Sequence, residues 1–213
     1  MTRLRLLAVV AAPAVLFAGF VYHPYVSNAT NAEAIADAVV ADTTRWGLAH
    51  LAIGVGYALM VLAFLAIRSY LRESGEERWS SVALPLAAVG SALFAILPGM
   101  EFAPLAAAET GGDVEGAQEE LMPWFIPILL TGAITFTIGV LCFAMAIVRS
   151  GVLTRQVQRL VVGGLVVMAI ARFVPLGAAQ IVIGVAAIVA LWPLAYEMWK
   201  RPRVESVDAF PAA

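Results

Sequence analysis

The chain of 213 residues is 62% hydrophobic and 13% charged, with a mean hydropathy of +0.90 and a formal net charge of −2. A composition this apolar excludes an ordinary soluble domain, and the lack of a basic patch excludes a nucleic-acid-binding protein. The apolar residues form six long runs that are separated by short polar segments. Each run is near or above the length of about 20 residues with which a helix crosses the hydrocarbon core of a bilayer.

The six runs predict six transmembrane helices. In chain order we expect them at about 4–22, 46–67, 79–100, 121–148, 160–177 and 181–199. Their hydrophobicity is continuous rather than alternating, which excludes a β-barrel and indicates an all-α six-helix bundle. We expect one domain over residues 1–203, whose first helix is retained rather than cleaved as a signal peptide, and a short tail at 204–213.

The charged residues predict the orientation of the bundle. Eleven of the 13 basic residues flank the same end of the runs, namely Arg3, Arg5, Arg68, Arg72, Arg78, Arg149, Arg155, Arg159, Lys200, Arg201 and Arg203. The positive-inside rule places that end, with both chain termini, in the cytoplasm. The preference for arginine over lysine is typical of a GC-rich bacterial genome, so we expect a multi-pass protein of a bacterial cytoplasmic membrane.

Two connections on the opposite, extracytoplasmic side are longer than simple turns. In the first, residues 30–33 (Thr-Asn-Ala-Glu) match a capping box opened by Thr30, which predicts a short amphipathic helix to about Ala41 across the mouth of the bundle. The second, at 102–120, contains the pair Gly111 and Gly112 together with five acidic residues. We expect this second connection to be a mobile, solvated loop.

The ionisable residues near the extracytoplasmic face gather at one depth. His23 ends the first run, His50 lies about one turn inside the second, Glu101 ends the third, Glu120 begins the fourth, and Arg172 lies in the outer third of the fifth. Ionisable groups inside a membrane are costly and usually face the bundle interior or a wet cavity. We therefore expect an outward-facing pocket, with Arg172 paired to Glu101.

Helical spacing predicts that aromatic residues line this pocket. Trp46, His50, Ile53 and Tyr57 share one face of the second helix, and Glu120, Trp124, Thr131 and Thr135 share one face of the fourth. Prolines at 98, 123 and 127 predict interrupted helix ends, which are tolerated at membrane depth where they line a cavity.

These patterns give two groups of candidate site residues. The candidate catalytic residues are Glu101, Glu120, His50 and Asp42, and the candidate substrate contacts are Trp46, Tyr57, Trp124, His23, Arg172 and Tyr25. Tyr25, Trp46 and Trp124 fit an interfacial aromatic belt equally well, and Glu120 fits a favourable acid at a helix N-terminus.

The first functional hypothesis is acid-initiated cyclisation of an isoprenoid dissolved in the bilayer. Glu101 or Glu120 would donate the proton, aromatic faces would stabilise the carbocation, and His50 or Asp42 would accept the final proton. In length, span number and carboxylates near one membrane face, the chain resembles the small integral-membrane terpene cyclases of meroterpenoid and indole-sesquiterpenoid pathways. The partners would be a hydrophobic small molecule and membrane lipid, with no cofactor and no metal, and a homo-oligomer is compatible with this interpretation.

Two other hypotheses stay open. His23 and His50 could bind haem, or zinc with an oxygen ligand from Glu101 or Glu120. A non-catalytic membrane subunit, a lipid binder or a small permease would equally show no catalytic motif. The sequence contains no phosphate-binding glycine loop, no nucleophile elbow and no zinc-protease histidine pair.

Overall fold

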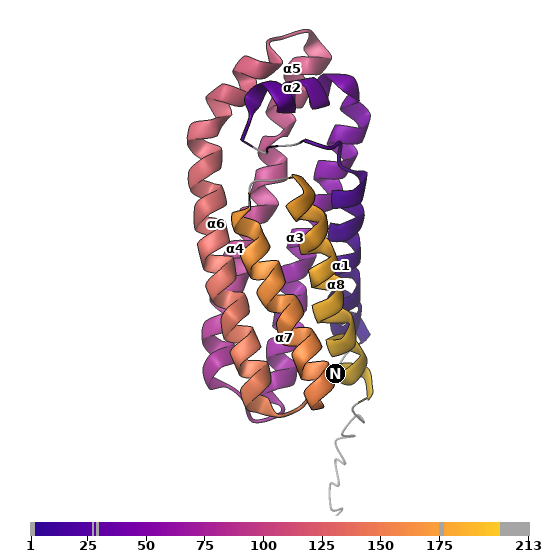
Figure 1. The fold of residues 1–213 in the computed structure, drawn as a ribbon, viewed down its shortest axis with the longest axis vertical. Helices are drawn as coiled ribbons and strands as arrows, with labels where there is room; N and C mark the ends of the chain where they lie inside the picture. Colours follow the sequence, from indigo (N-terminus) through magenta and orange to yellow (C-terminus); the bar gives the residue numbers. More distant parts are fainter. Residues whose placement is uncertain (1–2, 27, 29, 175–176, 201–213) are drawn as a thin grey trace, which may run out of the picture.

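The computed structural model describes residues 3–26, 28, 30–174 and 177–200, and the predicted tail at 204–213 lies outside this range. The regular structure within the described ranges is helical (Figure 1). The elements are α1 (Arg3–Tyr22), α2 (Ala32–Ala41), α3 (Thr43–Arg72), α4 (Arg78–Met100), α5 (Phe102–Thr110), α6 (Val114–Ser150), α7 (Arg155–Ile170), the 3-10 turn η1 (Ala171–Phe173) and α8 (Gly177–Lys200).

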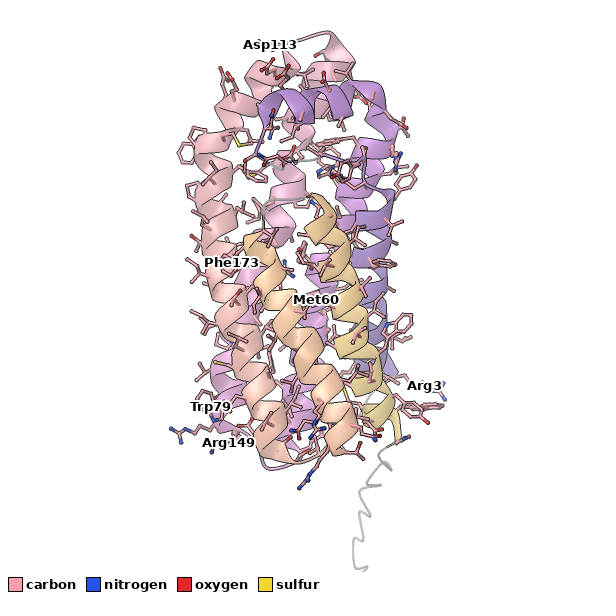
Figure 2. All side chains as sticks on the ribbon, in the orientation of Figure 1. Arg3, Met60, Trp79, Asp113, Arg149 and Phe173 are labelled. Carbon is pink, nitrogen blue, oxygen red and sulfur yellow. The ribbon has the colours of Figure 1, made fainter. Side chains whose placement is uncertain are left out.

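In the described part of the chain, six helical segments are long and apolar enough to cross a membrane: α1, α3, α4 with α5, α6, α7 with η1, and α8. This confirms the predicted all-helical architecture with six apolar helices, which is that of a multi-pass membrane protein. Figure 2 shows Arg3, Trp79 and Arg149 at one end of the bundle and Asp113 at the other. We call the end that carries α2 and α5 the roofed end, and the end where α1 begins and α8 finishes the terminal end.

The six long helices form a closed ring. In order around it, α1 contacts α3, α3 contacts α4, α4 contacts α6, α6 contacts α7, α7 contacts α8, and α8 returns to α1. Toward the terminal end, aromatic side chains fill the ring: Phe64 stacks on Phe143 at 5.1 Å between centroids and meets the edge of Phe136 at 5.8 Å. Met60 and Met168 are fully buried in the same core.

The roof consists of α2 and α5, which pack on the outer parts of α3 and α6. Ile35 and Val39 of α2 are buried there against Trp46, Leu105 and Val114, whereas Asp37 is exposed. The cap of α2 differs from the prediction. Its N-cap is Asn31, whose Oδ1 accepts a hydrogen bond from the amide of Ala34 at 3.0 Å.

Thr30 does not open a capping box, because its hydroxyl donates to Asn28 Oδ1 at 2.9 Å instead. The side chain of a cap residue must reach the free amides of the first turn, and here that position belongs to the next residue in the chain.

The predicted mobile loop at 102–120 is wrong. Residues 103–108 are mostly alanine, which has the highest helix propensity, and they form α5. Gly111 ends this helix with a positive φ of 73°, and Asp113 caps α6 by accepting the amide of Gly116 at 2.9 Å. The connection between the two helices is therefore a short turn, and α6 begins earlier than predicted.

The predicted breaks at Pro123 and Pro127 are absent from α6, whereas the interruption predicted just before Glu101 is found at the end of α4. The α6 helix is continuous through Pro123 and Pro127, and α4 continues past Pro98 to Met100. Each proline removes one amide donor without ending the helix, since the turns on both sides keep their own hydrogen bonds. The change of direction occurs at Glu101, the single residue between α4 and α5.

Several glycines allow backbones of the ring to touch; among them, Gly56 lies against Leu16, Gly90 against Phe136, and Gly139 against Ala87. A methyl group on Gly90 would lie 2.6 Å from the Cα of Phe136. Without a hydrophobic drive between helices in lipid, such close packing is a main source of association.

We expect Gly90→Ala to lower the stability of the detergent-solubilised protein by about 1–3 kcal/mol, because the α4 and α6 backbones must separate. The matched control is Gly163→Ala on α7, where an added methyl meets nothing within 4 Å. Thermal unfolding followed by circular dichroism compares the two. Equal midpoints for wild type and Gly90→Ala would show that this contact is dispensable.

Candidate functional site

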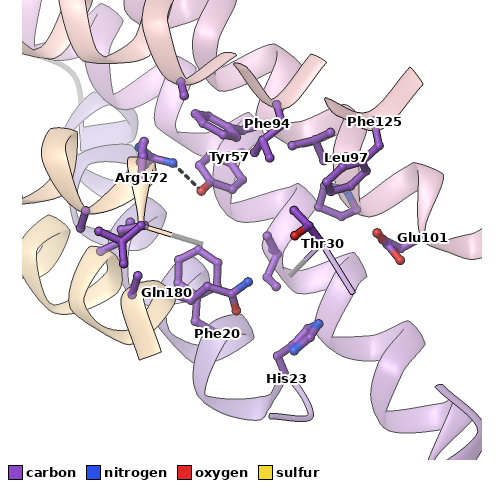
Figure 3. A pocket seen from close by; sticks show the side chains of 18 of the residues that line it. Phe20, His23, Thr30, Tyr57, Phe94, Leu97, Glu101, Phe125, Arg172 and Gln180 are labelled. Atoms are coloured by element: carbon purple, nitrogen blue, oxygen red, sulfur yellow. Dashed lines mark hydrogen bonds between the residues drawn. The ribbon is translucent and has the colours of Figure 1, made fainter. Parts of the chain in front are cut away.

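A cavity of about 360 Å³ lies inside the ring toward the roofed end (Figure 3). It exists because α7 ends and α8 begins short of the roof, whereas α6 extends to the roof (Figure 1). Side chains from α1, α3, α4, α6, η1 and α8 form most of its wall. The wall is mainly apolar, and its polar members are His23, Thr30, His50, Tyr57, Glu101, Arg172 and Gln180.

Glu101 borders the cavity at the joint between α4 and α5. Its side chain is only 6% exposed, and the amide of Gln118 donates to Oε1 at the long distance of 3.5 Å. The second oxygen, Oε2, is buried without a hydrogen-bond partner among the described residues. The carbonyl of Glu101 accepts the indole N–H of Trp46 at 3.3 Å, which fixes the joint against α3.

Two imidazoles line the same cavity, and each has one nitrogen already engaged. His50 Nδ1 is 2.8 Å from the carbonyl of Trp46, and His23 Nδ1 is 2.5 Å from the carbonyl of Pro24. A carbonyl can only accept, so in the neutral rings Nδ1 carries the hydrogen and Nε2 carries the lone pair. Both Nε2 atoms are thus available as proton acceptors.

The imidazoles form a compact aromatic group with Trp46. The His23 and His50 rings meet edge to face at 4.7 Å between centroids, and Trp46 lies 4.4 Å from His50 and 4.9 Å from His23. This contact joins the end of α1 to the first turns of α3. It also leaves no space for a porphyrin between the two histidines.

Arg172 occupies the opposite end of the cavity. Its Nη1 donates to the Tyr57 hydroxyl at 2.7 Å (Figure 3). Its guanidinium carbon lies 3.9 Å from the ring centroid of Phe136 and 4.4 Å from that of Phe94, which are cation–π contacts. Nε and Nη2 are buried and have no hydrogen-bond partner in the described part of the chain.

The predicted ion pair between Arg172 and Glu101 is wrong. Within the described ranges the ion pair found joins Lys200 to Glu197, at the terminal end. Arg172 lies instead at the level of Tyr57, and Tyr57 is seven residues, or roughly 10 Å, further along α3 than His50. The two charged groups thus stand at opposite ends of the cavity.

Apolar side chains separate the two ends. Phe20, Phe94, Leu97 and Phe125 line the middle of the cavity (Figure 3). Tyr57 stacks on Phe94 at 5.1 Å between centroids and meets the edge of Phe20 at 6.4 Å. A molecule in this space would contact aromatic faces along its length and polar groups at its ends.

One side of the cavity borders the outer surface of the bundle. Ile126 and Leu130 of α6, with Phe173 and Val174 beyond α7, line the cavity and are also exposed on the outside. We call these four residues the apolar rim. In a membrane, exposed apolar residues at this level face lipid, so the rim is the place where the cavity meets the bilayer.

The structure brings five of the predicted site residues to the cavity wall and leaves five away from it. His23, His50, Tyr57, Glu101 and Arg172 line the cavity, and Trp46 is buried behind the imidazoles. Asp42 is exposed and caps α3 by accepting the amide of Arg45 at 2.9 Å. The remaining three, Glu120, Trp124 and Tyr25, are exposed and absent from the wall.

The predicted stripe on the fourth span faces outward because α6 packs through a different face. Its inward face carries Gln118, Phe125, Gly132 and Gly139, which follow one another at intervals of seven residues. Glu120 and Trp124 lie on the other side of the helix, with Trp124 72% exposed. The heptad spacing of one amide, one phenylalanine and two glycines is the sequence signal that could have identified the inward face.

The described residues contain no group of three or more histidine, cysteine, aspartate or glutamate side chains close enough to bind a metal ion. The described structure therefore offers a metal ion no ligands beyond the imidazoles of His23 and His50, which contact each other.

Comparison with known proteins finds no matching family model, no matching curated protein and no matching solved structure. The site must be interpreted from its own geometry.

His23, which lies between α1 and α2, gives a pH prediction. Burial lowers the pKa of His23 below 6.5, the hydrogen bond with Pro24 opposes this effect, and the positive charge of Arg45 adds to it. The unfolded state therefore binds more protons near and below pH 6.5. We expect the free energy of unfolding to fall as the pH is lowered through this range. His23 contributes at most about 1.4 kcal/mol per pH unit to this fall.

In His23→Gln, which is neutral throughout, thermal unfolding above and below pH 6.5 should show a smaller loss than in wild type. The difference between the two proteins reports His23 together with its effect on the His50 ring that it contacts. Identical pH dependence in the two proteins would mean that His23 does not titrate on unfolding.

Proposed function

We propose that the protein is an integral membrane enzyme in which Glu101 protonates a hydrophobic isoprenoid substrate and so initiates its cyclisation. The observation that carries the proposal is the buried Glu101 carboxyl, whose Oε2 has no partner in the described structure, at the wall of an aromatic-lined cavity. No cation lies within ion-pair distance of it among the described residues. A buried charge without a partner is costly, which favours the neutral acid, the form that donates a proton.

The proposed reaction needs no reactant other than the substrate and the proton of Glu101. Glu101 transfers its proton to one carbon of an alkene, or to an epoxide oxygen, and leaves a cation on the adjacent carbon. A second alkene of the same molecule attacks that cation with its π electrons, which forms a carbon–carbon bond and closes a ring. Loss of a proton from the carbon beside the new cation restores an alkene, so the product is an isomer of the substrate.

The imidazoles support the last step. The bare Nε2 atoms of His50 and His23 can accept the leaving proton, and its return to Glu101 completes the cycle. Phe20, Phe94 and Phe125 supply ring faces and exclude water from the cation in between. The cavity volume of about 360 Å³ falls within the usual range for small-molecule sites.

We also propose the orientation and the membrane. The basic residues Arg3 and Arg149 lie at the terminal end and the acidic Asp113 at the roofed end, in accord with the wider charge asymmetry of the sequence. The positive-inside rule then puts the terminal end in the cytoplasm of a bacterial cell. The cavity and its apolar rim would open near the extracytoplasmic leaflet of the cytoplasmic membrane.

The test uses the full-length protein in liposomes that contain farnesyl- or geranylgeranyl-substituted arenes, with or without a terminal epoxide. In heavy water the exchanged Glu101 carboxyl should deliver one deuterium to carbon in an alkene substrate, and mass spectrometry should find an isomer one mass unit heavier. We expect Glu101→Gln to lower the rate by at least about 100-fold.

The matched control is Glu120→Gln, which removes an exposed carboxylate from the same end of the bundle and should keep full activity. Full activity in Glu101→Gln, or a product without deuterium from an alkene substrate that lacks the epoxide, would contradict proton donation by this residue. If the wild-type protein binds the arenes without any turnover, it is a non-catalytic binder of these molecules and not an enzyme that acts on them.

A further inference from the structure

The Arg172 guanidinium keeps one complete hydrogen-bonding edge free. A guanidinium has five N–H donors in a fixed plane, and the Nε–H and one Nη2–H point in parallel as a fork. In this protein Nη1 donates to Tyr57, whereas Nε and Nη2 both lack a partner among the described residues. The unsatisfied pair is therefore the fork that matches the two oxygens of a carboxylate.

The cation also lacks a counter-ion among the described residues. No carboxylate of the described chain lies within 4.0 Å of it, and its guanidinium carbon lies against the rings of Phe94 and Phe136, which are nearly perpendicular to each other. Aromatic faces attract a cation but accept no in-plane N–H bonds. A buried charge with two unsatisfied donors is costly unless another molecule completes it.

The surroundings supply one more donor. Tyr57 uses its oxygen to accept from Nη1, so its own hydroxyl hydrogen is available to a second oxygen. Arg172 and Tyr57 both line the cavity, and Arg172 immediately precedes the rim residues Phe173 and Val174. Nε and Nη2 are covered by protein atoms in this conformation, so a ligand reaches the fork when the arginine side chain rotates and Nη1 leaves the Tyr57 hydroxyl.

We propose that Arg172 and Tyr57 form a carboxylate-binding subsite, and that the ligand of the cavity is an amphiphile with a carboxylate at one end and an isoprenoid chain at the other. The carboxylate accepts from Nε and Nη2 of Arg172, and the chain folds along Phe94 and Phe125 toward Glu101. This subsite identifies the substrate class of the reaction proposed above. The proposal rests on that proposed function only for the reaction that follows binding.

The test measures binding of a farnesyl-substituted benzoic acid and of its methyl ester to the full-length protein in nanodiscs of zwitterionic lipid, at mildly alkaline pH. Isothermal titration calorimetry gives both dissociation constants. The two probes have the same chain and nearly the same size, and only the acid presents an anionic pair of oxygens. We expect the acid to bind at least about tenfold more tightly than the ester.

Arg172→Gln should abolish this preference while ester binding is kept. Arg172→Lys, which keeps the charge but not the fork, should retain only part of it. Arg45→Gln is the matched control, because Arg45 is also at the roofed end but donates to the carbonyl of Tyr22 outside the cavity. It should leave the preference intact.

Equal binding of acid and ester by wild type, or no binding of either, overturns the proposal without recourse to any variant. An acid preference that survives in Arg172→Gln also overturns it. A phospholipid phosphate offers similar oxygens, so the titration is repeated with anionic lipid in the nanodiscs. Loss of acid binding there would assign the subsite to a lipid headgroup and overturn the substrate assignment.

Glu101→Gln separates this proposal from the proposed reaction. It should bind the acid with the wild-type preference, because the carboxyl lies at the other end of the cavity. Preference for the acid without turnover would leave the subsite standing and remove the reaction. Turnover that depends on Glu101 but is the same for acid and ester would support the reaction and contradict the carboxylate-binding subsite.

Discussion

The contact between the Arg172 guanidinium and the aromatic rings around it divides the interior of the bundle into two parts. Toward the terminal end, Phe64 stacks on Phe143 and meets the edge of Phe136, and the three rings fill the interior. Nearer the roof than the end of α7 and the start of α8, the interior is hollow. The cation sits on the last ring of the filled part and is tied to α3 through Tyr57. Cation–π packing thus joins four elements of the ring where the solid core stops.

The cavity above this contact has different chemistry at its two ends. One end carries a carboxyl and two imidazoles whose Nδ1 atoms are occupied by backbone carbonyls, and the other carries a cation with a free hydrogen-bonding edge. Aromatic and aliphatic side chains separate them. Such a space fits a long molecule in one orientation only. A proton donor at one end and an anion-binding group at the other would then act on different parts of the same ligand.

Helix positions could be predicted from the sequence, because about 20 apolar residues are needed to cross a bilayer wherever they occur. Helix rotation was harder, since residues that face lipid and residues that face the core are both apolar. On α3 the stripe from Trp46 to Tyr57 is buried as its spacing indicates, because polar groups mark that face. On α6 the choice of Glu120 and Trp124 failed, because the packing face is marked by Gly132 and Gly139 rather than by charge. The helix α5 was missed because its alanines stand between acidic and glycine residues.

The apolar rim determines which ligand concentration governs the occupancy of the cavity. Ile126, Leu130, Phe173 and Val174 are exposed where lipid chains would surround the bundle. A ligand that arrives past them is already dissolved in the bilayer, so its occupancy follows its mole fraction among the lipids rather than its amount in water. Affinities for this cavity are therefore comparable between ligands only after division by their partition coefficients. A longer prenyl chain would raise occupancy through partitioning alone, without a new contact to the protein.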